Sequence, residues 1–277
     1  MSVRFAAVSL AKKAVKLALL GPATAARTTE PGLFVLIYHR VGAEMGQEMD
    51  LPEATFRRQA EWLARSATVV PLSRGVERLA AGDMDRDLVA ITFDDGYREV
   101  YRRARPILAD LGLPATVFLA TGFIEGQAPA PIRLGASGRG EPPEPLTWDQ
   151  VGEMRAGGLM EVGSHTHTHR PLDSLSAAEA EDECERANDI LAARVGTAPE
   201  IFAYPGAVAG NEDVVVRHYR WAVAGLGTKN VPGRAPAHQL SRTPVRASDG
   251  MLFFRRRLAG IAPLEDRLYE RLRRRSP

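Results

Sequence analysis

Short apolar runs alternate with polar segments of helical character along most of the chain. The apolar runs predict strands at residues 34–38, 68–70, 88–93, 115–119, 159–162, 201–204, 221–224 and 239–242. The segments between them predict helices over 52–64, 74–81, 98–111, 148–157, 177–194 and 212–218. Strands that alternate with helices are typical of parallel βαβ units. The pattern alone therefore predicts an α/β barrel or an open parallel sheet.

Two helices carry clear end signals, and one long segment carries none. Thr147 and Ser176 are expected N-caps, and Gly196 is expected to close the helix that Ser176 begins. Residues 124–145 are rich in Gly, Pro and Ala and show no periodicity. A loop of this length is usually functional or mobile. We expect it either to overhang a substrate groove or to be a variable insertion.

Composition narrows the class of protein. The 277 residues suit one domain of barrel size, and the 45% hydrophobic and 25% charged content are ordinary for a globular protein. A net charge of +2 gives no support for a nucleic-acid partner. The single cysteine, Cys184, excludes an internal disulfide framework and a zinc–thiolate centre.

The first thirty residues form a basic and apolar leader. An apolar stretch at 17–25 loosely imitates a signal peptide but is short and is broken by Gly21 and Pro22. No run approaches the ~18 apolar residues of a transmembrane span. We expect residues 1–30 to be an uncleaved leader on the cytoplasmic side that makes weak contact with a membrane surface, with export as the alternative. Residues 31–277 would form the main folded domain.

Two segments carry the candidate chemistry. The run at 88–93 stops at Asp94, Asp95 and Gly96, and the run at 159–162 leads to a second segment with three of the six histidines, His165, His167 and His169. Parallel α/β folds place their chemistry at such strand ends. In a helical turn, His165 and His169 would share one face. One carboxylate and two imidazoles can hold a catalytic divalent metal, although a solvated turn and an exposed histidine cluster are simpler alternatives.

These motifs resemble those of the polysaccharide deacetylase family, the carbohydrate esterases that share the NodB homology domain. TFDDG occupies residues 92–96, and H-[ST]-x-x-H occupies 165–169, about seventy positions further on. The segments YHRV at 38–41, PATVF at 114–118 and FAYPG at 202–206 agree with the family as well. The resemblance covers roughly residues 33–260. It implies a distorted (β/α) barrel of about seven parallel strands.

The resemblance also implies a reaction and a set of roles. Asp95, His165 and His169 would hold a divalent metal, zinc first, with cobalt or nickel as alternatives. Asp94 would be the general base, and the segment at Tyr204 would supply a backbone donor for the oxyanion. The substrate would be an acetylated glycan or amino sugar, deacetylated at nitrogen or at oxygen. A polymer, a lipid-linked sugar and a small amide all remain open.

The sequence departs from the family pattern at two places. The arginine that normally precedes the family's proline-tyrosine is missing from the segment at 202–205, and no histidine follows Leu240 where the family has its general acid. We expect Arg242 to replace the missing arginine and to fix Asp94 by a charge-assisted hydrogen bond. The acid would then be Asp94 itself, after it takes a proton, or His39, which could equally be a buried core residue.

Two rival functions come from other classes. A two-carboxylate glycosidase needs acids on different elements, ~5–9.5 Å apart, which the adjacent Asp94 and Asp95 do not provide. A catalytically silent, metal-containing carbohydrate-binding protein is made credible by the two departures. His167 lies two positions from each ligand histidine and is expected to point away from the metal, as a supporting or surface residue.

Overall fold

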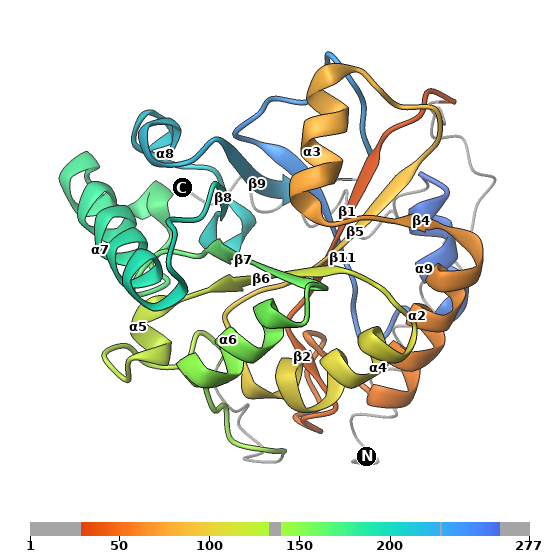
Figure 1. Ribbon diagram of the computed structural model, residues 1–277, viewed down its shortest axis with the longest axis horizontal. Helices are drawn as coiled ribbons and strands as arrows, with labels where there is room; N and C mark the ends of the chain where they lie inside the picture. Colours follow the sequence, from red (N-terminus) through yellow and green to blue (C-terminus); the bar gives the residue numbers. More distant parts are fainter. Residues whose placement is uncertain (1–28, 133–139, 228, 261–277) are drawn as a thin grey trace.

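The computed structural model describes residues 29–132, 140–227 and 229–260 (Figure 1). Its main sheet has the strand order β10-β1-β11-β9-β8-β7-β6-β5-β4, and β1 also pairs with β5. Because β1 pairs with β11 on one side and with β5 on the other, seven parallel strands close into a barrel and confirm the predicted fold. The barrel strands are β1 (Leu33–Tyr38), β5 (Leu88–Phe93), β6 (Ala115–Leu119), β7 (Met160–Ser164), β8 (Ile201–Ala203), β9 (Trp221–Leu226) and β11 (Leu240–Pro244).

Four short strands add to this barrel. β4 (Thr68–Val69) runs parallel to β5, and β10 (Lys229–Asn230) runs antiparallel to β1. β2 (Arg40–Val41) and β3 (Asp50–Leu51) form a separate pair directly after β1. Asn230 also links β1 to β11, because its side-chain amide donates to Leu33 O and Ser241 O and accepts from Ser241 N. The side-chain amide thus makes the hydrogen bonds that a peptide group of a neighbouring strand would make, and it fixes the start of β11.

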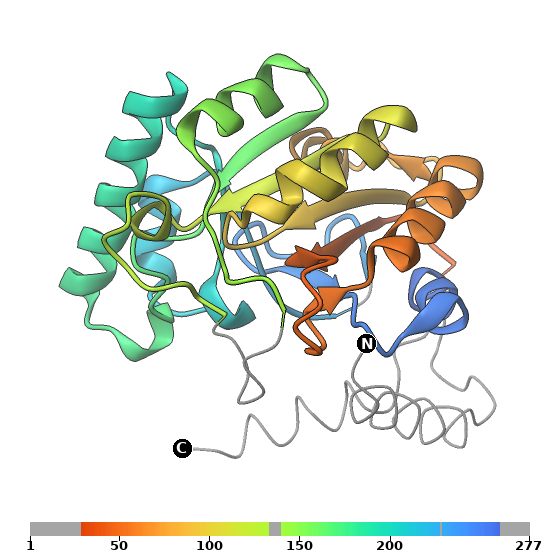
Figure 2. The same cartoon turned by 90° about the horizontal axis from the view of Figure 1, so that it is seen from below.

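Helices cover the outer face of the barrel. Figures 1 and 2 show α2 and α9 side by side at one end of the molecule and α7 at the other. The helices are α2 (Glu53–Ser66), α3 (Leu72–Ala81), α4 (Arg105–Asp110), α5 (Thr121–Ile124), α6 (Trp148–Ala156), α7 (Ala177–Val195), α8 (Glu212–His218) and α9 (Gly250–Leu258). Short turns of helix add η1 (Val100–Ala104), η2 (Leu172–Ser174) and η3 (Pro205–Ala207).

The helix ends follow the sequence signals in two cases and depart from them in one. Thr147 and Ser176 both form capping boxes, and Gly196 ends α7 in the left-handed conformation, as predicted. The single helix predicted over 98–111 is wrong in detail. It is divided into a π-helical turn, η1, and the α-helix α4, whose first turn contains Pro106. Proline has no N–H to continue the hydrogen-bond ladder, so the ladder changes at this point.

Strand alternation divides the core into two layers. Phe34, Leu36 and Tyr38 of β1 pack outwards in one cluster with Phe56 of α2. Leu33 and Val35 belong to a second cluster, with the inward residues of the other strands and with Leu72, Val76 and Leu79 of α3. Alternate residues of each strand therefore fill the barrel, and α3 packs against this filling beside β1 (Figure 1).

The leader predicted over residues 1–30 lies almost wholly outside the described residues. The boundary at residue 30 and the expected membrane contact therefore stay predictions. Within the described part of the chain, no helix is both long and apolar enough to cross a membrane.

Candidate active site

The alternation that fills the barrel also delivers four polar side chains to its carboxyl end. His39 continues the inward series of β1, Asp94 that of β5 and His165 that of β7, while Arg242 follows the inward Leu240 on β11. They meet around one carboxylate: Arg242 Nη1 donates to Asp94 Oδ1 across 2.7 Å. His39 Nε2 and His165 Nε2 each lie 3.9 Å from Asp94 Oδ2. The contact expected between Arg242 and Asp94 is thus present.

Asp95 reaches the same centre by a different route. Adjacent residues of a strand point to opposite faces, which would turn Asp95 away from Asp94. However, β5 ends at Phe93, and Asp95 adopts φ 74°, the left-handed conformation. The turn directs its carboxylate inwards, with Oδ1 3.5 Å from His165 Nε2 and 3.1 Å from His169 Nε2. The cost of such a backbone is of order 1–3 kcal/mol, which is typical of functional sites.

Asp95, His165 and His169 form a group that fits a metal ion. One ligand atom from each lies within 4.8 Å of the other two. Asp95 is 1% exposed, yet neither of its oxygens accepts a hydrogen bond of good geometry within the described residues. His165 Nδ1 lies 2.7 Å from Ala203 O, a contact that places the proton on Nδ1 and leaves Nε2 free to bind. A buried carboxylate without donors, facing two imidazoles, is the donor set of a divalent metal site.

The two histidines do not share a helical face. Residues 165–169, here called the histidine loop, contain no helix, and Thr166 (φ 63°) and His169 (φ 61°) are both left-handed. This double bend, rather than helical spacing, brings the two rings to a centroid distance of 4.8 Å. His167 points away, as predicted, but it is buried rather than at the surface, and its Nδ1 lies 2.9 Å from Thr121 Oγ1.

Charge compensation keeps both aspartates ionised. Burial raises the pKa of Asp94, but the positive charge of Arg242, with smaller contributions from His165 and His39, outweighs burial and leaves the pKa below its ordinary value. Burial also raises the pKa of Asp95, and the proximity of His165 and His169 lowers it further than burial raises it. For His169 the same contact with Asp95 overcomes burial and raises the pKa.

Arg242 lies inside the barrel beneath these groups. It is 1% exposed, and its guanidinium carbon is 5.8 Å from the centroid of the Phe118 ring. The same ring lies 6.4 Å from the ring of His165. Sequence reasoning gave Phe118 no role, although its inward position on β6 follows from the alternation. Phe118 forms an apolar support under the side chains of Arg242 and His165.

His39 is the more open of the groups around Asp94. Its side chain is 20% exposed. Burial lowers the pKa of His39 by more than Asp95 and Asp94 raise it, so the imidazole is neutral at neutral pH. It is therefore not the enclosed core residue that the sequence left open as an alternative.

Tyr204 is not brought into this centre. Its N–H donates to Val223 O across 3.1 Å, so the sheet occupies the donor that the resemblance assigned to the oxyanion. Its side chain lies in the outer core with Phe202 and the residues of α8, and burial raises the pKa of the phenol. The N–H is engaged in the sheet because Tyr204 directly follows β8 and continues the pairing of that strand with β9.

The described ends of the long loop lie close to Tyr97, two residues after Asp95. Tyr97 Oη accepts from Ile132 N at 2.6 Å. The buried Arg40 donates to the carbonyls of Glu141 and Pro142 and packs 5.1 Å from the Tyr97 ring centroid. The loop is thereby anchored beside the site. Whether it overhangs a groove depends on residues 133–139, which lie outside the described residues.

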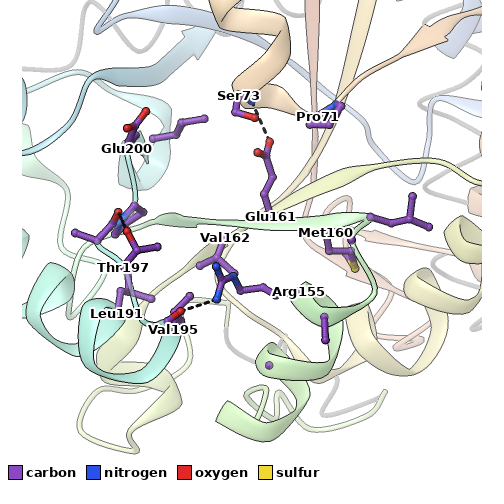
Figure 3. A pocket seen from close by; sticks show the side chains of 17 residues that line it. Pro71, Ser73, Arg155, Met160, Glu161, Val162, Leu191, Val195, Thr197 and Glu200 are labelled. Carbon is purple, nitrogen blue, oxygen red and sulfur yellow. Dashed lines mark hydrogen bonds between the residues drawn. The ribbon is translucent and has the colours of Figure 1, made fainter.

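A cleft of about 770 Å³ lies at the other end of the barrel (Figure 3). Met160 and Glu161 at the start of β7 line it, whereas His165 follows the end of this strand. Its polar groups are engaged: Glu161 accepts from Ser73 N at 3.0 Å, and Arg155 donates to Val195 O at 2.5 Å. This cleft is separate from the Asp and His groups.

A parallel barrel with an Asp-His-His group at the carboxyl ends of its strands has the architecture of a barrel hydrolase. The sequence matches the polysaccharide deacetylase family over residues 81–222, and the chain belongs to this family. Membership supports deacetylation of a carbohydrate as the activity. The match spans both aspartates and the histidine loop, but His39 and Arg242 lie outside it.

Individual proteins agree with this assignment. The chain is 26% identical to a putative polysaccharide deacetylase, YxkH, of Bacillus subtilis over 247 residues, which are 87% of this chain and 81% of that protein. It is 29% identical to the poly-β-1,6-N-acetyl-D-glucosamine N-deacetylase of Escherichia coli over 140 residues, 49% of this chain but only 20% of that protein. The fold is similar to that of the Streptococcus pyogenes deacetylase PplD in complex with acetate, with a TM-score of 0.69, 20% identity and coverage of 85% and 100% of the two chains.

Proposed function

We propose that this chain is a metal-dependent carbohydrate deacetylase that hydrolyses the N-acetyl group of an amino sugar in a glycan. The observation that carries the proposal is Asp95, a buried carboxylate that accepts no hydrogen bond of good geometry from the described residues and lies within reach of the Nε2 atoms of His165 and His169. The activity that the name of the E. coli relative states, on a poly-N-acetylglucosamine, supports an amino-sugar substrate. O-acetyl groups are the alternative.

Asp95, His165 and His169 would hold the metal. A carboxylate with two imidazoles suits zinc, and also cobalt or nickel. When bound, a divalent ion supplies Lewis-acid polarisation of the acetyl carbonyl and makes water a stronger acid. The carbonyl of Ala203 orients His165 for this role, because it accepts the proton of Nδ1.

Asp94 would be the general base. Arg242 occupies its Oδ1, which leaves Oδ2 facing His39 and His165 and free to accept a proton from the attacking water. A lowered pKa means that Asp94 is ionised at neutral pH and ready to accept. General-base assistance of this kind contributes ~10²- to 10⁴-fold.

The leaving nitrogen needs a proton as the C–N bond breaks and acetate departs. Asp94 can return the proton that it took from water. His39 is the second candidate, because its Nε2 lies 3.9 Å from Asp94 Oδ2 and its side chain is partly open to solvent. Asp94 and His39 lie next to each other in the site, so mutagenesis separates their contributions to protonation of the leaving nitrogen.

The test is acetate release from N-acetylglucosamine oligomers, with product amines counted in parallel. The protein loaded with zinc is compared with the same protein treated with chelator and then resupplied with metal. We expect acetate and amine in equal amounts, loss of both after chelation and recovery on resupply. Shortened chains would indicate a glycosidase instead. Bound metal and bound glycan without acetate would indicate a silent carbohydrate-binding protein.

A further inference from the structure

The histidine loop is held from outside by one carboxylate of α7. Glu183 Oε2 accepts from His167 N at 2.9 Å and from Thr168 N at 2.7 Å, and Oε1 accepts from the Thr168 hydroxyl. Glu183 is 5% exposed, and within the described residues all of its hydrogen bonds come from this loop. One buried carboxylate therefore satisfies three donors that lie between His165 and His169.

The loop needs such support because its backbone is unfavourable. Thr166 adopts φ 63°, which is rare for a β-branched side chain, and His169 adopts φ 61°, a region that few residues other than glycine occupy. Their conformation persists only where the surrounding structure over-determines it. The other hydrogen bonds to the loop's backbone are neutral: Thr121 N donates to Thr166 O, Gly122 N donates to His167 O, and Thr166 Oγ1 accepts from His169 N. Glu183 supplies the only charged support among these contacts.

We propose that Glu183 is a positioning residue that fixes His165 and His169 in the arrangement in which they bind the metal. The inference rests on the proposed metal site. Glu183 touches neither imidazole; it acts through the backbone of residues 167 and 168, which lie between them. Charge-assisted hydrogen bonds are roughly twice as strong as neutral ones, and groups that orient ligands typically contribute 10- to 100-fold to metal affinity.

The experiment measures metal affinity rather than turnover. Zn²⁺ affinity is determined by competition with a chelating dye for the wild type, Glu183→Ala, Glu183→Gln and the control Asp189→Ala, which lies exposed on the same helix. We expect Glu183→Ala to raise the Kd by ~10- to 100-fold. Glu183→Gln should restore most of the affinity, because an amide oxygen can accept both N–H groups while its NH₂ donates to Thr168. Asp189→Ala should leave the Kd unchanged.

Thermal melting of the metal-free proteins separates positioning from simple stabilisation. A purely structural residue lowers the melting temperature without altering the Kd, and this result for Glu183→Ala would overturn the inference while the proposed function stands. A wild type that binds no Zn²⁺ would overturn both. If Glu183→Ala does not fold, Glu183→Asp takes its place, since the shorter side chain withdraws the carboxylate from the N–H groups of residues 167 and 168. An unchanged Kd in that variant refutes the role of Glu183.

Discussion

Arg242 donates to Asp94 across 2.7 Å although the two residues are 148 positions apart in the chain. Both are almost fully buried; Asp94 directly follows β5, and Arg242 lies within β11. The bond holds one oxygen of the carboxylate and leaves the other facing the histidines. Arg242 thus makes the contact expected of it in place of the arginine missing from the segment at 202–205, and it does so from β11, which pairs with β1 on the side opposite β5.

Replacement of Arg242 tests this relationship. Arg242→Ala should lower kcat by more than ~10-fold, because Asp94 loses both its orientation and its compensating charge. Arg242 lowers the pKa of Asp94 against burial, so its removal should raise that pKa and move the acid limb of the kcat/KM profile to higher pH. Arg242→Lys, which keeps the charge, should shift the limb less. Normal turnover and an unmoved limb in the alanine variant would remove Arg242 from the site.

Replacement of Asp94 and replacement of Asp95 should have different effects on metal binding and turnover. Asp94→Asn should reduce kcat by ~10²- to 10⁴-fold while Zn²⁺ still binds, because only the proton acceptor is lost. Asp95→Asn should abolish tight Zn²⁺ binding, and activity with it, since a neutral amide replaces the one anionic ligand. Equilibrium dialysis with metal analysis, run beside the acetate assay, distinguishes them. Equal metal loss in both variants would contradict the assignment of separate roles.

Replacement of His39 tests how the leaving nitrogen is protonated. If His39 is the acid, His39→Gln should lower kcat by ~10²-fold or more on an N-acetyl substrate. The loss should be much smaller on an activated acetate ester, whose leaving group needs no proton. Equal losses on both substrates would assign His39 to packing or substrate binding and leave Asp94 as the acid.

The architecture and the identity of the central residues were accessible from the sequence. Apolar runs located the strands, and the motifs at the strand ends identified Asp94, Asp95, His165 and His169. The local geometry around the metal ligands was not accessible. Asp95 and the histidine loop depend on left-handed residues without glycine, a conformation that no local pattern announces. It becomes stable only through contacts made after folding.

Contacts between residues far apart in the chain could not be predicted from the sequence pattern, for the same reason. Glu183 reads as one more polar residue of an exposed helix, and only the packing of α7 against the histidine loop reveals its buried carboxylate. The sequence gives no sign that the backbone N–H of Tyr204 has an acceptor, but the pairing of β8 with β9 provides one, the carbonyl of Val223. Strand register, not residue type, determines which amides remain available.

Glycine at position 163 provides a test of how tightly the site is packed. A Cβ on Gly163 of β7 would lie 2.4 Å from Cδ1 and Cε1 of the Phe118 ring, which supports Arg242 and His165. Gly163→Ala should therefore destabilise the fold by about 1–3 kcal/mol, and the displaced ring should also reduce kcat.

Gly152 of α6 is the matched control. A Cβ there meets nothing within 4 Å, so Gly152→Ala should stabilise the fold by about 0.5–1 kcal/mol through the better helix propensity of alanine. It should leave kcat unchanged, because Gly152 lines the cleft at the other end of the barrel. Urea unfolding and acetate release of both variants measure the two effects. If Gly163→Ala were as stable and as active as Gly152→Ala, the Phe118 ring would have room to move, and its role as a rigid support would be wrong.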